Sequence, residues 1–254
     1  MLRGLIFDVD GTLALTEETH RQTFNEVFSE MEMGFQWDPG LYARLLTISG
    51  GKERITAYLR QFAPETLTKG GKSLVQEIHR RKTSLFQDRV ASGEVPLRPG
   101  VARLLGEAWQ AGLKVGIASA AHHGNLEVLL QKNLGHGVLE KIDVICSGNS
   151  VARKKPAPDS YLQALDGLNL PASDCLAIED AAEGVQAARS AGIKVVVTAN
   201  DFTAHHDFGG AVAVTDGLGE PDAPARLVSG DGPEEVLVNL SCLTSWHGKP
   251  KCKA

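Results

Sequence analysis

Six polar residues follow apolar segments of the chain, and their types suit the transfer of a phosphoryl group. The six are Asp8, Asp10, Ser119, Lys155, Glu179 and Asp180. Carboxylates that meet in one place repel each other and need a cation, and an all-oxygen set of ligands suits Mg²⁺. A lysine and a hydroxyl beside that cation would suit the remaining phosphate oxygens. The set therefore predicts a magnesium-assisted phosphoryl-transfer site.

The first two carboxylates are two residues apart, in Asp8-Val9-Asp10-Gly11. One aspartate can act as a nucleophile and carry the phosphoryl group as an aspartyl-phosphate. The other lies close enough to protonate the leaving alkoxide and later to take a proton from water. Gly11 allows the backbone to turn sharply, so that amides approach the phosphate.

The elements that must position these residues alternate along the second half of the chain. Helix-period segments separate short apolar ones, which predicts a parallel sheet covered on both faces. Ligands of such sheets lie beyond the carboxyl ends of the strands. The expected strands are 5–7, 113–118, 142–146, 175–178, 193–198 and 211–214, and the expected helices are 101–111, 125–133, 159–168 and 181–191. The fold class is therefore α/β, with a Rossmann-like parallel sheet core.

Residues 15–92 differ, because their apolar positions recur with the helical period and no comparable strand signal is present. Helices are expected at 17–31, 38–46, 51–62 and 69–86. We expect a helical cap at 15–92, inserted into an α/β hydrolase core formed by 1–14 and 93–254. Residues 217–233, rich in Gly, Pro and Asp, are expected to be irregular, and 246–254 to form a frayed basic tail.

Composition excludes several classes of protein. The 254 residues carry a net charge of −5, which argues against a nucleic-acid-binding protein. No apolar run reaches the roughly 18 residues that would span a membrane. The four cysteines are few and unevenly spaced, so no disulfide framework is expected, and Cys146 and Cys175 are interpreted as small buried hydrophobes. Without a visible leader segment, the expected location is the cytoplasm, or the plastid stroma if a transit peptide was removed.

The core motifs resemble those of the haloacid dehalogenase-like phosphatases. Asp8-Val9-Asp10-Gly11-Thr12-Leu13 matches the first motif, and Ser119, Lys155 before Pro156, and Glu179-Asp180 follow in the family's order. The resemblance covers residues 1–216. It implies that Asp8 is the nucleophile and Asp10 the general acid/base.

The same resemblance implies the remaining roles. The carboxylates of Asp8 and Asp180 and the backbone carbonyl of Asp10 would hold Mg²⁺, with Glu179 as a ligand or as a partner of the ligands. Ser119 and Lys155 would hold the transferring phosphoryl group, and the helical insertion would be a mobile cap. Glu179 and Asp180 would also suit a helix N-terminus by charge alone.

Segments of the cap and of the late core point to a narrower group, the CbbY-type sugar-bisphosphatases of the Calvin cycle. They include residues 50–55, 79–83, 155–159, 206–211 and 222–226. The resemblance implies hydrolysis of xylulose 1,5-bisphosphate, an inhibitor of Rubisco. A bisphosphate needs a second anion site, and the cap offers cations for it. The substrate-binding residues expected there are Glu17, His20, Gly50, Gly51, Lys52, Arg54, His79 and Lys82.

Other functions stay open at this point. A β-phosphoglucomutase resembles the chain in its core motifs and in His20, and it would pass the phosphoryl group to a second sugar hydroxyl. A phosphatase for phosphoglycolate or another small phosphate would share the core. A non-catalytic binding module is a third alternative. The mixed charges of Lys52-Glu53-Arg54 also suit a solvated surface. The expected partner is a small phosphorylated sugar, with no nucleic acid and no membrane, and the chain is expected to be a monomer or weak oligomer.

Overall fold

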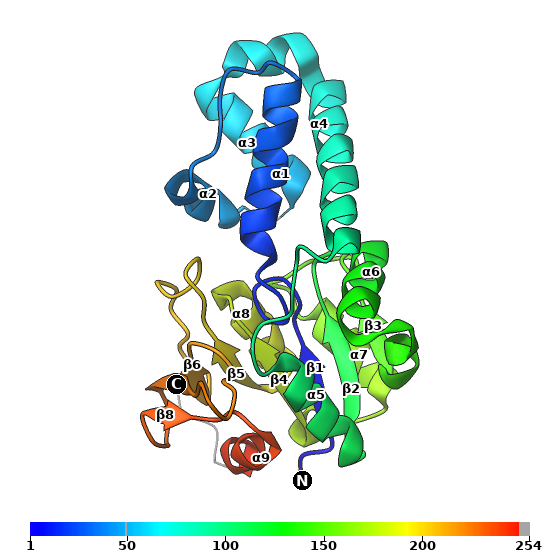
Figure 1. Cartoon of the computed structure of the whole chain (residues 1–254), viewed down its shortest axis with the longest axis vertical. Helices are drawn as coiled ribbons and strands as arrows, with labels where there is room; N and C mark the ends of the chain where they lie inside the picture. Colours follow the sequence, from blue (N-terminus) through cyan, green and yellow to red (C-terminus); the bar gives the residue numbers. More distant parts are fainter. Residues whose placement is uncertain (49, 249–254) are drawn as a thin grey trace. The chain divides into compact units, whose positions relative to one another are not determined.

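The computed structural model describes residues 1–48 and 50–248, and it divides into two compact units (Figure 1). One unit comprises Met1–Leu15 with Pro96–Ala254, and the other comprises Thr16–Val95. The first is built on a sheet. The second consists, over its described residues, of helices and their connections. No helix in the described part of the chain is both long enough and apolar enough to cross a membrane.

The sheet of the first unit has the strand order β3-β2-β1-β4-β5-β6-β7-β8. Its first six members are parallel, and β7 and β8 are added antiparallel at one edge. This arrangement confirms the predicted α/β fold. The strands are β1 (Gly4–Phe7), β2 (Lys114–Ala118), β3 (Val144–Cys146), β4 (Cys175–Glu179), β5 (Lys194–Thr198), β6 (Ala213–Thr215), β7 (Ala225–Ser229) and β8 (Glu235–Val236).

The register of the central strands decides which side chains meet at the carboxyl edge. Phe7, the last residue of β1, pairs with Ile117 of β2 and with Ile178 of β4. Asp8 therefore leaves the sheet beside the ends of both neighbours, next to Glu179. All four residues of β1 are buried, so this edge is anchored in the core.

Helices cover the sheet, and two of them share a core cluster with its strands. This cluster joins α7 (Asp159–Leu168) and α8 (Ala182–Ser190) to alternate strand residues such as Ile6 and Val195. It also takes in Cys146 and Cys175, both buried free thiols, as interpreted from the sequence. The other helices are α5 (Val101–Gln110), α6 (His123–Leu134) and α9 (Leu240–Gly248), with 3₁₀ turns at His136–Lys141 and Ala172–Asp174.

Two expectations about the C-terminal third were wrong. Residues 217–233 are not wholly irregular, because 225–229 form β7, a short strand whose Gly- and Pro-rich flanks hid it in the sequence. Trp246 does not belong to a frayed tail: it lies in α9, is 2% exposed, and donates its ring N–H to the Asp231 carbonyl at 2.9 Å. The buried Trp246 ring thus anchors α9 against the rest of the unit. Residues 249–254 of the expected tail lie outside the described residues.

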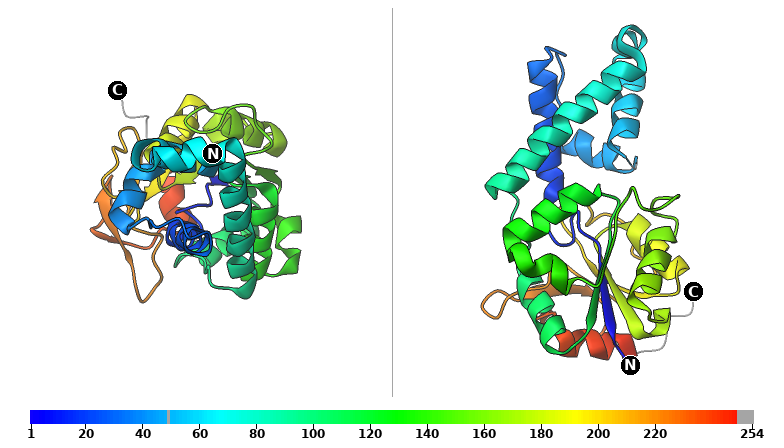
Figure 2. Two further views of the ribbon diagram at one scale, coloured as in Figure 1. Left: turned by 90° about the horizontal axis from the view of Figure 1, so that it is seen from above. Right: turned by 90° about the vertical axis from the view of Figure 1, so that its right-hand side faces the viewer.

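The helical unit contains α1 (Thr16–Glu30), α2 (Pro39–Leu46), α3 (Gly51–Phe62) and α4 (Pro64–Ser92), with α1 and α3 packed along α4. Its core is aromatic, and Trp37, wholly buried, contacts the rings of Phe24, Phe28 and Tyr58. Helix α4 is longer than the predicted 69–86 and includes a break at Gly71, whose φ of 56° and ψ of −152° are not helical. The views in Figure 2 show this long helix beside α1.

Candidate active site

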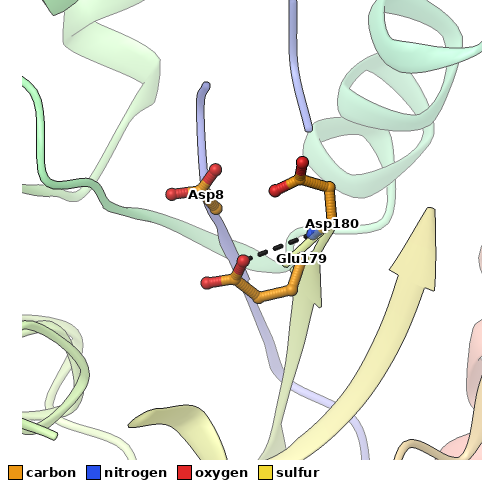
Figure 3. A group of neighbouring side chains, drawn as sticks. All are labelled: Asp8, Glu179 and Asp180. Atoms are coloured by element: carbon orange, nitrogen blue, oxygen red, sulfur yellow. Dashed lines mark hydrogen bonds between the residues drawn. The ribbon is translucent and has the colours of Figure 1, made fainter. Parts of the chain in front are cut away.

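Three buried carboxylates gather where β1 and β4 end (Figure 3). Asp8, Glu179 and Asp180 are 7%, 1% and 4% exposed, and one oxygen of each lies within 4.8 Å of the others. The backbone N–H of Asp180 also donates to Glu179 Oε2 at 3.3 Å. Burying like charges this closely is unfavourable unless positive charge compensates them. The cluster therefore has the character of a cation site.

Lys155 supplies part of that positive charge. Its Nζ lies 2.6 Å from Asp8 Oδ1 and 2.6 Å from Glu179 Oε1, and its side chain is only 9% exposed. The hydroxyl of Tyr161 donates to the same Glu179 oxygen at 2.5 Å. Glu179 thus holds the lysine against Asp8, and the ammonium contacts two of the three carboxylates. The remaining negative charge favours the binding of a further cation.

The pKa values of these groups reflect the same excess of buried negative charge. Burial raises the pKa of Asp8 from 3.8 to about 8; Lys155 opposes this shift, and the charges of Glu179 and Asp10 add to it. Burial alone would lower the pKa of Lys155, but Asp8 and Glu179 outweigh it and raise that pKa above its ordinary value. Burial, followed by the charge of Glu179, raises the pKa of Tyr161. Lys155 and Tyr161 therefore stay protonated, and burial favours the neutral form of Asp8 when no cation is bound.

A glycine makes the close approach of the carboxylates possible. Gly11 has a φ of 86°, and a Cβ there would lie 2.1 Å from Asp180 Oδ2. Asp180 thus packs directly against the loop that follows β1, where Thr12 Oγ1 also donates to its Oδ1 at 3.4 Å. The Asp180 carboxylate thus occupies the space that a methyl group on residue 11 would fill. This donor set and its crowding fit a small, hard divalent cation.

Two further predicted residues lie at the same edge of the sheet. Asp10 is half-buried in the loop after β1, and its charge contributes to the raised pKa of Asp8. Ser119 directly follows β2 and is 1% exposed; its Oγ accepts from Ala121 N at 3.0 Å, and its own N–H donates to Cys146 O at 2.9 Å. These bonds fix Ser119 in a tight turn at a strand end.

The helical unit links Glu17 to Arg54 through a tyrosine. The Tyr42 hydroxyl donates to Glu17 Oε2 at 3.1 Å and accepts from Arg54 Nη1 at 3.1 Å. The other two nitrogens of Arg54 donate to the carbonyls of Leu45 and Ile48, at 3.1 Å and 3.3 Å. The guanidinium therefore joins α3 to the C-terminal end of α2, and its predicted contact with substrate stays a prediction.

His20 and Lys82 form a second predicted pair in this unit. The Lys82 ammonium lies 2.6 Å from His20 Nδ1, and Phe24 and Phe86 present ring faces to it at 5.0 Å and 4.9 Å. Since an ammonium can only donate, His20 Nδ1 acts as the acceptor and the ring proton resides on Nε2. Lys82 is 8% exposed and His20 is half-buried, so the lysine is the more shielded member of the pair.

Gly50 is the residue before α3, and Gly51 is the first residue of this helix. Gly50 has a φ of 96°, and a Cβ on Gly51 would lie 2.8 Å from the His79 ring. The predicted residues Gly51 and His79 are therefore in contact. Lys52 is exposed and lines a cavity of about 870 Å³ with Arg60 and Lys72. The cavity thus gathers three cations and the Glu53 carboxylate between α3 and α4.

The sequence interpretation did not identify several residues of the site. Tyr161 and Thr12 contact Glu179 and Asp180, and Asn200, after β5, donates to Asp180 Oδ2 at 2.8 Å. The position of Asn200 shortly after a predicted strand was an available signal, since Asp8, Ser119 and Asp180 also follow strands. Arg98 carried no such signal, because its contacts come from segments about a hundred residues away.

The comparisons with known proteins agree with this geometry. A family model described as haloacid dehalogenase-like hydrolase matches residues 2–192. The plasmid-encoded protein CbbY of Cupriavidus necator is 45% identical over 248 residues, 97% of this chain and 97% of that protein.

Solved structures give the same result. The crystal structure of CbbY from Rhodobacter sphaeroides in complex with phosphate is similar with a TM-score of 0.76 and 40% identity, covering 85% of this chain and 95% of that one. A mutant of the same protein, in complex with xylulose 1,5-bisphosphate, matches with the same TM-score, identity and coverage. The chain belongs to the haloacid dehalogenase-like hydrolases, and it is a phosphatase of the CbbY type.

Proposed function

We propose that this chain is a Mg²⁺-dependent phosphatase that hydrolyses xylulose 1,5-bisphosphate through an aspartyl-phosphate on Asp8. The observation that carries the proposal is the bridge from Lys155 Nζ to Asp8 and Glu179, 2.6 Å to each, inside a buried carboxylate cluster. A lysine that touches the nucleophile is also placed to touch the phosphoryl group on that nucleophile. Hydrolysis would thereby remove a Rubisco inhibitor.

The first step forms a bond between Asp8 and phosphorus. A carboxylate oxygen of Asp8 attacks the phosphorus, the bond from phosphorus to the sugar oxygen breaks, and Asp10 gives its proton to that oxygen. In the second step Asp10 takes a proton from water, the water oxygen attacks the phosphorus, and the bond to Asp8 breaks. Inorganic phosphate leaves, and both aspartates return to their starting states.

The other side chains of the cluster hold charge in place. Lys155 neutralises charge on the phosphoryl oxygens, and Glu179 and Tyr161 fix its position. Mg²⁺ would be held by Asp8, Asp180 and the Asp10 carbonyl, with Glu179 beside them, and would supply further positive charge to the phosphoryl group. Because Glu179 Oε1 already accepts from both Lys155 and Tyr161, we favour Glu179 as a partner of the lysine rather than as a direct ligand.

The helical unit would recognise the rest of the substrate. Support for a bisphosphate comes from the complex of R. sphaeroides CbbY with xylulose 1,5-bisphosphate, a protein 40% identical to this chain. His20 Nε2, held as a donor by Lys82, suits a sugar hydroxyl or a phosphate oxygen. Lys52 is a candidate for the second phosphate. A cytoplasmic or, after removal of a transit peptide, stromal location and a monomeric or weakly oligomeric state stay predictions.

A substrate panel tests the proposal. Purified protein with Mg²⁺ is assayed for phosphate release from xylulose 1,5-bisphosphate, phosphoglycolate and glucose phosphates at matched concentrations. We expect the bisphosphate to have the highest kcat/KM by a wide margin. A reversed ranking would overturn the proposed substrate. Conversion of β-glucose 1-phosphate to the 6-phosphate without phosphate release would instead identify a mutase.

A further inference from the structure

Asn200, two residues after the end of β5, joins the Asp180 carboxylate to the loop that carries Asp10. Its Nδ2 lies 2.8 Å from Asp180 Oδ2 and 3.3 Å from the Gly11 carbonyl. Both atoms are acceptors, and one amide nitrogen offers the two N–H groups that they need. A single side chain thus spans the gap between the segments that follow β1 and β4.

The orientation of this amide is fixed from its other end. Asn200 Oδ1 accepts from Phe202 N at 2.9 Å, within the turn that follows β5. The backbone N–H of Asn200 donates to Thr203 Oγ1 at 3.1 Å, which holds the same turn. With Oδ1 engaged by a backbone donor, Nδ2 must face Asp180 and Gly11. The amide cannot rotate by half a turn without losing all three side-chain bonds.

Arg98 holds the two backbone segments that the Asn200 side chain connects, the loop after β1 and the end of β5. Its Nη1 donates to the Gly11 carbonyl at 2.5 Å and to the Thr198 carbonyl at 2.7 Å. Its Nη2 donates to the Ala199 and Asp216 carbonyls, at 2.8 Å and 2.9 Å. Arg98 is 8% exposed. One buried guanidinium therefore sets the distance between the loop after β1 and the residue that precedes Asn200.

We propose that Asn200 is a positioning residue for the divalent cation of this enzyme: it orients Asp180 as a ligand, from a backbone frame that Arg98 holds. The inference rests on the Mg²⁺ dependence proposed above. An amide suits this place because it donates a hydrogen bond to the carboxylate without adding charge. Partners that orient metal ligands typically contribute about 10- to 100-fold to metal affinity.

The experiment measures metal binding directly. Mn²⁺, which binds hard oxygen ligands as Mg²⁺ does, is titrated into the full-length protein, and the free ion is followed by electron paramagnetic resonance. The variant is Asn200→Ser, whose shorter hydroxyl can still accept from Phe202 N but cannot reach Asp180. We expect its Mn²⁺ dissociation constant to rise about tenfold or more. The half-saturating Mg²⁺ concentration for activity should rise by the same factor, while KM for substrate at saturating Mg²⁺ stays unchanged.

Asn239→Ser is the matched control. Asn239 Oδ1 likewise accepts a local backbone bond, from Cys242 N at 2.9 Å at the start of α9, and Asn239 does not belong to the carboxylate cluster of Asp8, Glu179 and Asp180, so Mn²⁺ affinity should equal that of the wild type. If Asn200→Ser does not fold, Asn200→Thr is measured in the same way, with folding checked by circular dichroism. A folded Asn200 variant that binds Mn²⁺ within twofold of the wild type overturns the inference. A wild-type protein that does not bind Mn²⁺ overturns the proposed metal dependence itself.

Discussion

The Lys155 ammonium lies 2.6 Å from both Asp8 and Glu179, so that one buried lysine joins the ends of two neighbouring strands. This bridge exists because β1 and β4 pair in parallel with Phe7 opposite Ile178. Asp8 and Glu179, the residues that follow this pair, therefore lie side by side at the carboxyl edge of the sheet. The lysine itself comes from a loop more than a hundred residues after Asp8, and Tyr161 at the start of α7 steadies its position through Glu179.

Replacing this lysine should remove most of the activity. In Lys155→Ala the phosphoryl oxygens lose a fixed positive charge, and loss of one such preorganised group typically lowers kcat by about 10²- to 10³-fold. Lys154→Ala is the matched control, because Lys154 is the adjacent lysine and is exposed. Steady-state assays of both variants give the comparison. Equal losses in the two variants would contradict the role given to Lys155.

The second prediction concerns Asp8 and pH. Burial raises the pKa of Asp8 from 3.8 to about 8, so the metal-free folded state binds this proton more tightly than the unfolded state does. A raised carboxyl pKa contributes stability that is present below about pH 4 and is lost as pH rises toward 8. We expect Asp8→Asn to abolish turnover, keep the fold, and remove this part of the pH dependence.

Thermal unfolding in a chelator, recorded from pH 5 to pH 9, tests this expectation. The melting temperature of Asp8→Asn relative to the wild type should increase as pH rises. Added Mg²⁺ should stabilise the wild type more at pH 8 than at pH 6, because a cation binds the ionised carboxylate. Parallel melting curves for the two proteins at every pH, or undiminished activity of the variant, would remove Asp8 from this role.

Gly11 gives a third prediction. Gly11→Ala adds a Cβ 2.1 Å from Asp180 Oδ2 and also forces a non-glycine residue to a φ of 86°. The backbone cost of a left-handed residue is about 1–2 kcal/mol. Gly112→Ala is the matched control, because Gly112 has a φ of 70° but nothing within 4 Å of the added Cβ.

Both glycine variants should therefore lose similar stability from the backbone alone. Only Gly11→Ala should also weaken metal binding, since only there must the Asp180 carboxylate, the proposed metal ligand, move. Urea unfolding gives the first quantity and a Mn²⁺ titration the second. If Gly112→Ala weakened Mn²⁺ binding as much as Gly11→Ala, the crowding at Asp180 would not be the cause.

The sequence allowed the sheet and the acidic residues to be predicted together, because apolar segments followed by charged residues identify both. Asp8, Glu179 and Asp180 directly follow or end predicted strands, and Lys155 precedes a proline in the motif order. The last two strands, β7 and β8, and helix α9 were harder to predict. They are short, the two strands are flanked by Gly- and Pro-rich segments, and Val236 and Trp246 become core residues only through long-range packing.

Residues that act through the backbone were missed for a different reason. Arg98 binds four carbonyls from segments far away in the chain, and no local pattern marks an arginine as buried. Asn200 donates a hydrogen bond to the Asp180 carboxylate, which follows another strand. Such contacts depend on how two loops approach each other, which the periodicity of a single segment does not encode.

The final prediction distinguishes the roles of Lys52 and Arg54, two neighbouring cations of α3 that were both expected from the sequence to bind substrate. All three side-chain nitrogens of Arg54 donate within the helical unit, to Leu45, Ile48 and Tyr42. Arg54→Ala should therefore lower the free energy of unfolding by about 1–3 kcal/mol, since hydrogen bonds of charged groups contribute on that scale. Lys52→Ala removes an exposed side chain, so its stability should change by less than about 0.5 kcal/mol.

The effects of the two substitutions on KM should be the reverse of their effects on stability, with the selective effect expected for Lys52→Ala. If Lys52 binds the second phosphate, Lys52→Ala raises KM for xylulose 1,5-bisphosphate and leaves KM for a monophosphate unchanged. Arg54→Ala, measured at a temperature where it remains folded, should change the two KM values by similar factors, because it loosens the unit rather than removing one phosphate contact. A bisphosphate-specific rise in KM for Arg54→Ala, with none for Lys52→Ala, would show that the substrate contact belongs to the arginine.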